Sequence, residues 1–367
     1  MSTVAVVIAA GAGTRMKSAL PKPLHPLVGW PMLLHVLNAT SSIDLSGMVV
    51  VVGHGADRVV DEIATLAPPA LAARFVEQPV QRGTGDAVAI GLSAVDPTEL
   101  IEDSMVLVLP GDTPLLRPTS LAELAEVHRS SGAAATVLTA RVPDPTGYGR
   151  VLRGEDGRVL GIVEHRDATP EERLVDEINT SVFCFRGDLL GGALRELRPD
   201  NDQGELYLTD TIGLLRAEGH SVAAHCLADA VEASGVNDRH QLAEAEDELR
   251  RRLITAWQLA GVTFVDPAST HVDAAVELAA DVTIWPGCIL RGATVVASGA
   301  EIGPHVDLLD SRIGAGARIE HATARDAEVG TGALVGPFVV LEPGASVPAG
   351  AVVPPFEVVS PAARHPS

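Results

Sequence analysis

Aromatic side chains and cysteines are scarce in this sequence. Among its 367 residues, Phe, Trp and Tyr together make up 3%, and there are three cysteines, Cys184, Cys226 and Cys288. An odd number of widely spaced cysteines supplies neither a disulfide framework nor the ligand spacing of a zinc site. It predicts a reducing, cytoplasmic setting. With few aromatics, the core has to be built from Val, Leu, Ile and Ala, which is typical of buried parallel strands or of a β-solenoid.

Basic residues are also few, and long apolar runs are lacking. Lys and Arg number 27 against 48 Asp and Glu, which gives a formal net charge of −21. Because such a surface repels phosphodiester backbones and anionic lipids, we expect no binding to nucleic acid or to a membrane surface. A local basic pocket for a small anion remains compatible with this charge. The apolar start at 1–11 has no basic flank and no apolar run reaches about 20 residues, so neither a signal peptide nor a membrane span is expected.

The first two thirds of the chain alternate short apolar runs with helix-length segments. Apolar runs at 4–9, 48–52, 105–109 and 134–139 each predict a strand, and segments such as 31–40 and 120–130 predict helices. This alternation is typical of a doubly wound α/β sheet, Rossmann-like and mostly parallel. A long amphipathic segment from Asp238 to Leu259, followed by Gly261, predicts a helix that connects two domains.

From about residue 276 the sequence repeats with a period of six. The repeated aliphatic positions are Leu278, Ile284, Leu290, Val296, Ile302 and Leu308, then Ile313 and Ile319 shifted by one, then Val329, Val335, Leu341, Val347 and Val353. One inward aliphatic in every six residues is the pattern of a hexapeptide β-helix, with one aliphatic for each flat face of a triangular coil. Ordinary Val- and Gly-rich strands of a sandwich are the alternative.

A glycine-rich loop follows the first predicted strand. Ile8-Ala9-Ala10-Gly11-Ala12-Gly13-Thr14-Arg15-Met16 is followed by Pro21-Lys22. Glycines at the end of a strand let backbone N–H groups approach a phosphate, and Arg15 and Lys22 add positive charge beside them. This combination predicts a triphosphate site, but not a Walker loop, which requires Gly-Lys-Ser/Thr. Asp112, in Gly111-Asp112 after another strand, is a candidate metal ligand, with a helix cap as the alternative.

These motifs, together with others in the same order, resemble one enzyme family. The further motifs are Gln78 with Gly83-Thr84-Gly85, Gly111-Asp112-Thr113-Pro114-Leu115, Asp144-Pro145-Thr146-Gly147-Tyr148-Gly149-Arg150, Ile162-Val163-Glu164-His165, Glu177-Ile178-Asn179-Thr180, Glu205-Leu206-Tyr207-Leu208-Thr209-Asp210 and Gly235-Val236-Asn237. The sequence resembles the bifunctional N-acetylglucosamine-1-phosphate uridylyltransferase / glucosamine-1-phosphate acetyltransferase family from residue 4 to about 350. The resemblance implies a nucleotidyltransferase domain at 1–237, a linking helix at 238–261, a truncated left-handed β-helix at 262–358 and a tail at 359–367.

The resemblance also implies roles for individual residues and a reaction. Arg15 and Lys22 would act in catalysis by holding the triphosphate of UTP, and Asp112 and Asn237 would bind Mg²⁺. The nucleotide would be bound by Ala9, Gly11, Gly13, Thr14, Gln78, Gly83 and Thr84. The sugar phosphate would be bound by Gly149, Glu164, Asn179, Tyr207 and Thr209. His54, between two glycines, is expected to have a loop role, because an anionic phosphate nucleophile needs no general base.

The sequence departs from the family pattern in the acetyltransferase half. Family members carry an Arg where Glu342 stands, and the lysine pair expected after Pro354-Pro355 is missing, as is the segment with the catalytic His. A carboxylate at Glu342 would repel a sugar phosphate, so we expect no acetyltransferase activity. By analogy with the family, the short β-helix predicts a homotrimer, and a monomer with a short solenoid is the alternative. Two alternatives stay open: the same chemistry on another sugar-1-phosphate or nucleotide, and a non-catalytic, nucleotide-sugar-binding regulatory protein.

Overall fold

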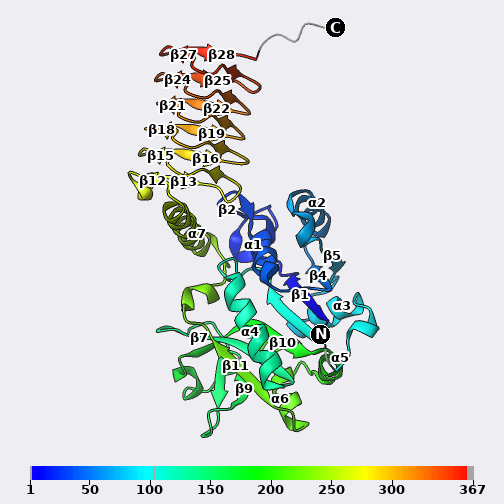
Figure 1. Cartoon of the computed structure of the whole chain (residues 1–367). Coiled ribbons are helices and arrows are strands. Elements are labelled where there is room, and N and C mark those ends of the chain that lie inside the picture. The colour runs from blue at the N-terminus through cyan, green and yellow to red at the C-terminus, as the bar shows by residue number, and fades with distance from the viewer. Residues whose placement is uncertain (1, 103, 362–367) are drawn as a thin grey trace. The chain divides into compact units, whose positions relative to one another are not determined.

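The computed structural model describes residues 2–102 and 104–361 and divides them into two compact units. Unit 1 comprises Met1–His25 and Pro31–Ala245, and unit 2 comprises Pro26–Trp30 and Glu246–Ser367. Figure 1 shows both along the chain, from blue to red. The boundary divides the helix α7 (Arg239–Leu259) and assigns Pro26–Trp30 to the second unit. The domain bounds given above therefore stay a prediction.

Unit 1 is built on a nine-stranded mixed sheet with the central order β11-β7-β10-β6-β1-β4-β5. Its strands are β1 (Thr3–Ala9), β4 (Gly47–Val52), β5 (Arg74–Glu77), β6 (Met105–Pro110), β7 (Ala135–Arg141), β8 (Arg150–Arg153), β9 (Val159–Val163), β10 (Glu177–Arg186) and β11 (Val222–Cys226). The strands β6, β1, β4 and β5 run parallel, and β10 is antiparallel to its neighbours β6 and β7. The predicted, mostly parallel α/β sheet is confirmed.

Helices cover both faces of this sheet. The helices of unit 1 before α7 are α1 (Met32–Ala39), α2 (Ala56–Leu66), α3 (Thr84–Ser93), α4 (Pro118–Ser131), α5 (Gly187–Glu196) and α6 (Asp210–Ala217). Apolar residues of α3, α5 and α6 form one core with Val4 and Val6 of β1. Ala5 and Val7, which point to the opposite face, are just as buried, and α4 packs against β7, β10 and β11. Burial on both faces explains why the strands read as continuous apolar runs.

Unit 2 is a left-handed β-helix of short parallel strands. One sheet contains β12 (Thr263–Phe264), β15 (Thr283–Ile284), β18 (Glu301–Ile302), β21 (Arg318–Ile319), β24 (Leu334–Val335) and β27 (Val352–Val353). The second contains β13 (His271–Val272), β16 (Ile289–Arg291), β19 (Asp307–Leu309), β22 (Thr323–Arg325), β25 (Val340–Leu341) and β28 (Val358–Val359). The third contains β14 (Glu277–Leu278), β17 (Val295–Val296), β20 (Arg312–Ile313), β23 (Glu328–Val329) and β26 (Ser346–Val347). The strands β2 (Pro26–Leu27) and β3 (Trp30–Pro31) form a separate pair.

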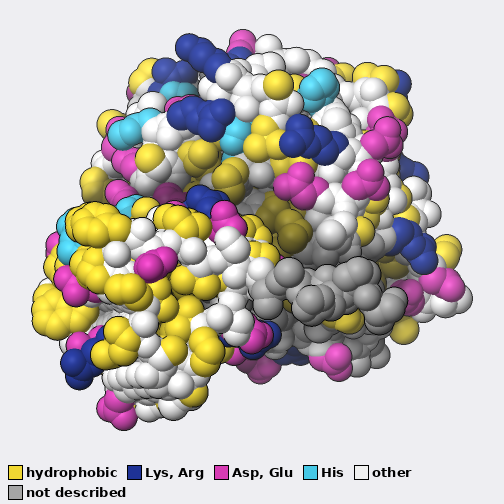
Figure 2. All heavy atoms as spheres, turned by 90° about the horizontal axis from the view of Figure 1, so that it is seen from above, with side chains coloured by type: hydrophobic (Ala, Val, Ile, Leu, Met, Phe, Trp, Pro, Cys, Tyr) yellow, Lys and Arg dark blue, Asp and Glu magenta, His cyan; other side chains and the backbone are white. Residues whose placement is uncertain are grey.

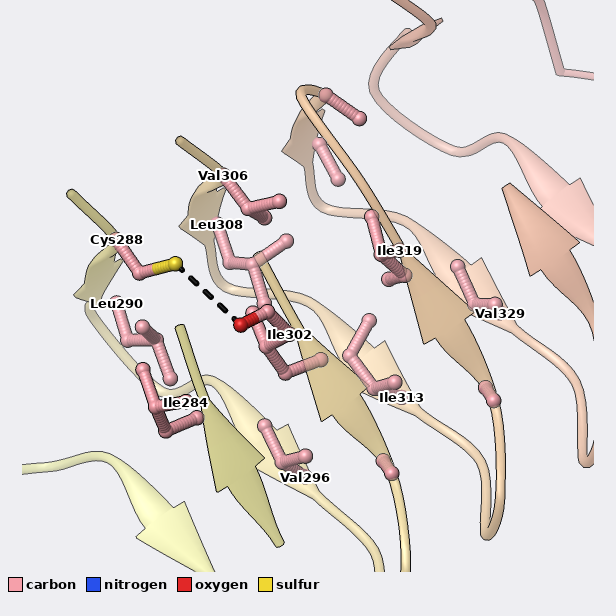
Figure 3. Packing of buried hydrophobic residues seen from close by; sticks show 14 of the residues in the cluster. Ile284, Cys288, Leu290, Val296, Ile302, Val306, Leu308, Ile313, Ile319 and Val329 are labelled. Carbon is pink, nitrogen blue, oxygen red and sulfur yellow. Dashed lines mark hydrogen bonds between the residues drawn. The ribbon is translucent and has the colours of Figure 1, made fainter. Parts of the chain in front are cut away.

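Each aliphatic of the six-residue repeat lies on one of these strands and points inward. Figure 3 shows these side chains stacked in columns, with Ile284, Ile302 and Ile319 one above another. Cys288 lies in the same core, where its thiol donates to the carbonyl of Ile302 at 3.5 Å. The predicted β-helix is confirmed, and the sandwich alternative is wrong. Ala324 fills the inward position between Ile319 and Val329, which the aliphatic pattern left without a residue.

Among the described residues, no helix combines the length and the apolarity that a membrane span needs. All three cysteines are free; Cys184 and Cys288 are buried and Cys226 is exposed. Burial raises the pKa of the thiols of Cys184 and Cys288 above the ordinary range, so both remain protonated core residues.

Candidate active site

The glycine-rich loop leaves the carboxyl end of β1, between the ends of β4 and β6. These three strands end side by side because they are neighbours in the parallel part of the sheet. Glycines allow the loops after β1, β4 and β6 to pack closely against one another. A Cβ on Gly53 would lie 2.4 Å from the carbonyl oxygen of Ala10, and one on Gly111 would lie 2.9 Å from the Cβ of Ala9. The loop is thereby held against the sheet edge at which open α/β folds bind ligands.

The loop itself turns through Gly13, which has a φ of +61°. A Cβ there would lie 2.6 Å from the Cβ of Lys22, so the glycine makes room for the stem of the lysine. Thr14 and Arg15 follow in a short 3-10 turn, Thr14–Met16, and both are exposed. Around Gly11 a Cβ would meet nothing within 4 Å, which leaves the backbone of this residue open to a ligand.

Four predicted residues converge beside this loop. The Nζ of Lys22 lies 2.5 Å from Oδ2 of Asp112 and 2.9 Å from Oδ1 of Asn237, and Nη2 of Arg15 donates to the same Asn237 oxygen at 2.9 Å. The contacts from Lys22 to Asp112 and from Arg15 to Asn237 span 90 and 222 positions of the chain. The Lys22 side chain is 12% exposed and that of Asp112 is 33% exposed, so the pair lies at the rim of the fold.

Backbone contacts hold the two oxygen-bearing residues in place. Asp112 follows the end of β6, and its carbonyl accepts a hydrogen bond from the N–H of Val236 at 2.8 Å. The N–H of Asn237 donates to Oε1 of Gln241 in α7, also at 2.8 Å. The two residues are therefore fixed next to each other before any ligand binds.

The donor set of these two residues fits a hard divalent cation. The Asp112 carboxylate and the Asn237 amide present oxygens that already converge on one positive charge, the ammonium of Lys22. Magnesium commonly takes one or two protein oxygens and fills its other positions with water and substrate phosphates. Over residues 2–102 and 104–361, no cluster of three or more His, Cys, Asp or Glu suited to a metal occurs. The two oxygens of Asp112 and Asn237 would leave the other positions of such an ion to water and to phosphate oxygens of a ligand.

A cavity of about 370 Å³ opens next to the charged cluster. Its lining includes Gln78, Gly83 and Thr84 of the predicted nucleotide site and Glu164 and Thr209 of the predicted sugar site, together with Gly11 and Asp112. Gln78 directly follows β5 and is 4% exposed, and Thr84 begins α3. The Oγ1 of Thr84 accepts a hydrogen bond from the N–H of Leu208 at 3.0 Å, so its hydroxyl is fixed to the wall. Four of the seven predicted nucleotide residues and two of the five predicted sugar residues thus line one cavity. Ala9, Gly13 and Thr14 are not among the residues that line it.

The carboxyl group of Glu164 lines this cavity and has a raised pKa. Burial raises its pKa, and the nearby Asp210 and Asp167 raise it further, whereas a 3.1 Å hydrogen bond from Oγ1 of Thr209 lowers it. Gly149 packs against this carboxylate, since a Cβ there would lie 3.3 Å from Oε2 of Glu164. A carboxyl group in such surroundings gains from hydrogen-bond donors, and sugar hydroxyls are donors of this kind.

Two predicted sugar-binding residues have other partners. Oδ1 of Asn179 accepts from the N–H of Ser181, which has a φ of +62°, and the N–H of Asn179 donates to the carbonyl of Gly149. The Tyr207 hydroxyl accepts from Nε2 of Gln203 at 2.8 Å. Ser181 and Phe183, which belong to none of the motifs, and Glu205, which begins one but was given no role, line the cavity instead. His54 is exposed in the loop after β4.

Sequence reasoning also missed Gln81. Its Nε2 donates to the carbonyl of Ala10 at 2.6 Å and so connects the segment after β5 to the glycine-rich loop. The only signal was its place three residues after Gln78, between two motifs.

Comparison with known proteins agrees with this geometry. Residues 5–204 match the MobA-like NTP transferase domain. The bifunctional protein GlmU of Streptomyces avermitilis is 49% identical over 340 residues, which cover 92% of this chain and 69% of the relative. The chain belongs to the GlmU family. GlmU of Corynebacterium efficiens is 45% identical over 94% of this chain and 71% of its own length, and GlmU of Kineococcus radiotolerans is 49% identical over 92% and 68%.

Membership of the GlmU family confirms the resemblance stated from the motifs. The chain is a nucleotidyltransferase and has sugar-1-phosphate uridylyltransferase activity. The roles of the individual site residues stay predictions, which the geometry above makes specific.

Proposed function

We propose that this GlmU-family chain forms UDP-N-acetylglucosamine and pyrophosphate from UTP and N-acetylglucosamine-1-phosphate. An oxygen of the sugar phosphate attacks the α-phosphorus of UTP in line, a new P–O bond forms, and the bond to the pyrophosphate oxygen breaks. The nucleophile is already an anion at neutral pH, so the reaction requires alignment and charge neutralisation rather than a general base. The observation that carries the proposal is the hydrogen-bonded cluster of Lys22, Arg15, Asn237 and Asp112, the last of which itself lines the cavity.

Each group then has a chemical task. Lys22 and Arg15 bind the triphosphate and offset the charge that develops on the leaving group. Asp112 and Asn237 hold Mg²⁺, which supplies further charge neutralisation when it is bound. Ala9, Gly11, Gly13, Thr14, Gln78, Gly83 and Thr84 bind the nucleotide; Gly149, Glu164, Asn179, Tyr207 and Thr209 position the sugar phosphate. Since the substrates are soluble metabolites and the cysteines are free, we place the reaction in the cytoplasm.

A pyrophosphate-release screen tests this function. Four nucleoside triphosphates are paired with several hexose and hexosamine 1-phosphates in the presence of Mg²⁺. We expect the highest kcat/KM with UTP and N-acetylglucosamine-1-phosphate. A higher value with another sugar or nucleotide would favour the same chemistry in a specialised pathway, and no turnover with any pair would favour a regulatory, nucleotide-sugar-binding protein.

We propose further that this polypeptide does not transfer acetyl groups. Glu342 is exposed on the turn after β25, where its negative charge would oppose a sugar phosphate. An assay with glucosamine-1-phosphate and acetyl-CoA should give no turnover, and measurable acetylation would refute the proposal.

We also propose a homotrimer held together by the β-helix. Hydrophobic side chains gather over its last coils, as the front of Figure 2 shows, and the exposed ones are Leu334, Phe338, Val340, Val352, Phe356 and Val358. Exposed apolar area of this kind is typical of an interface between copies. Light scattering coupled to gel filtration should give three times the 38.1 kDa chain mass, and Val340→Asp should lower it. A monomer at micromolar concentration would contradict the proposal.

A further inference from the structure

The amide of Gln78 is fixed by a residue to which no role has been assigned. Nε2 of Gln78 donates to Oδ2 of Asp86 at 2.8 Å and points its other hydrogen towards the carbonyl of Gly83 at 3.4 Å. Asp86 is the third residue of α3 and is half-buried. Both hydrogens of the amide therefore have acceptors within the protein.

Chemistry determines the orientation of this amide. A carboxylate and a backbone carbonyl can only accept hydrogen bonds, so the nitrogen of Gln78 has to face Asp86 and Gly83. The opposite orientation would place Oε1 of Gln78 against two acceptors. Within residues 2–102 and 104–361, Oε1 accepts no hydrogen bond, and Gln78 lines the cavity. The group that Gln78 offers to a ligand is thus an acceptor.

We propose that Asp86 is a positioning residue that makes the site specific for uracil over cytosine, an inference that rests on the proposed function. The ring nitrogen N3 of uracil carries a hydrogen and can donate to Oε1 of Gln78. The N3 of cytosine is itself an acceptor, and its neighbouring exocyclic group is a donor where uracil has an acceptor. A fixed acceptor that meets N3 therefore favours uracil, whereas an amide that turns freely could also donate to the N3 of cytosine.

Asp86 has a second effect that the test has to separate. A negative charge in the first turn of a helix is favourable in itself, whatever the side chain contacts. Asp57 occupies the first turn of α2 and is exposed, so it is a matched control for this effect. A loss of helix stability would change the kinetics with UTP and CTP alike, whereas release of the Gln78 amide would change their ratio.

The experiment compares UTP with CTP in the wild type, Asp86→Asn, Asp86→Glu and Asp57→Asn. The amide in Asp86→Asn can donate as well as accept, so Gln78 is free to turn; Asp86→Glu keeps an acceptor-only group. We expect the ratio of kcat/KM for UTP over CTP to fall at least fivefold in Asp86→Asn through a higher KM for UTP. A fall of about this size is expected for loss of one hydrogen bond to the base. The kcat with UTP and the KM for the sugar phosphate should stay within about twofold, because neither depends on that contact. Asp86→Glu and Asp57→Asn should keep the wild-type ratio.

Calorimetric titration with UDP and CDP gives a readout that does not depend on turnover. Weaker selectivity for UDP in Asp86→Asn, with the wild-type melting temperature retained, supports the inference. An unchanged ratio in Asp86→Asn, an equal fall for both nucleotides, or a wild type that prefers CTP would overturn it. Absence of UTP turnover in the wild type with every sugar phosphate would instead refute the proposed function, so the two failures are distinguishable.

Discussion

Replacement of Lys22 by methionine tests the charged cluster most directly. The sequence contains two lysines, Lys17 and Lys22, five positions apart. Lys22 Nζ is held by oxygens of Asp112 and Asn237 at 2.5 and 2.9 Å, whereas the Lys17 side chain is exposed. Lys17→Met is therefore a matched control, because it removes the same charge from the same loop without removing these contacts.

The two consequences of Lys22→Met differ greatly in size. Removal of one preorganised cation from the developing charge of a transition state costs about 2.7–4 kcal/mol, or 10²–10³ in kcat. The effect on folding is smaller, because Asp112 keeps a third of its side chain in contact with solvent and can be hydrated. A cost of roughly 1 kcal/mol for the lost partner would lower the melting temperature of a chain of this size by only a few degrees.

Pyrophosphate release measures kcat, and differential scanning fluorimetry measures the melting temperature. We expect Lys22→Met to lose at least a hundredfold in kcat and Lys17→Met to stay within about threefold of wild type. Retention of more than a tenth of wild-type kcat by Lys22→Met would refute the assignment. So would a fall in activity matched by unfolding at the assay temperature.

Three further predictions concern individual side chains of both units. Burial and the nearby Arg129 and Arg186 lower the pKa of His128 from 6.5 to about 4. As the pH is lowered from 6.5 to about 4, the unfolded chain therefore takes up a proton that the folded chain does not, and the free energy of unfolding falls. The loss is about 3 kcal/mol, and urea unfolding of His128→Asn should show a correspondingly shallower fall in this range. The raised pKa of Glu164 has the opposite effect on stability, because ionisation of this buried carboxyl destabilises the fold as the pH rises above 4.5. Glu164→Gln should therefore have a higher melting temperature than the wild type at pH 8 and the same melting temperature at pH 4. Its KM for the sugar phosphate should rise. Ile302→Ala removes a fully buried side chain of the β-helix and should cost about 2–5 kcal/mol in the free energy of unfolding, measured with denaturant, without a change in KM for UTP.

The sequence predicted the β-helix well because each repeat carries a single strong signal. When the strands are short, the aliphatic side chain at every sixth position faces the interior of the coil. Ala324 was missed because the repeated positions were recognised by Leu, Ile and Val alone. The backbone conformation of His305, His321 and Phe338 was not predicted for another reason. Their φ values are +55°, +46° and +63°, which sequence patterns assign to glycine or asparagine.

The site was predictable in part only. Strand ends and glycines indicated the phosphate loop from the residues alone, whereas Asn237 and the sugar pocket came from the resemblance to a family. The contact between Gln78 and Asp86 was not predictable, since a side-chain hydrogen bond between a loop and the first turn of a helix leaves no periodicity. The pairing of Val28 with Glu246, whose carboxylate accepts from the Val28 N–H at 2.7 Å, was hidden for the same reason.

The acidity of the chain explains why the charged cluster has to be built before substrate arrives. A net charge of −21 opposes the approach of UTP and of a sugar phosphate, so local cations have to outweigh a long-range repulsion. A flexible ammonium in water would be hydrated and would lose side-chain entropy on binding a phosphate. Lys22 is already ordered by Asp112 and Asn237, and Arg15 by the same Asn237 oxygen. When a phosphate binds, its oxygens replace the protein oxygens that Lys22 and Arg15 contact. Most of the entropy cost of ordering these two side chains therefore falls on folding rather than on binding.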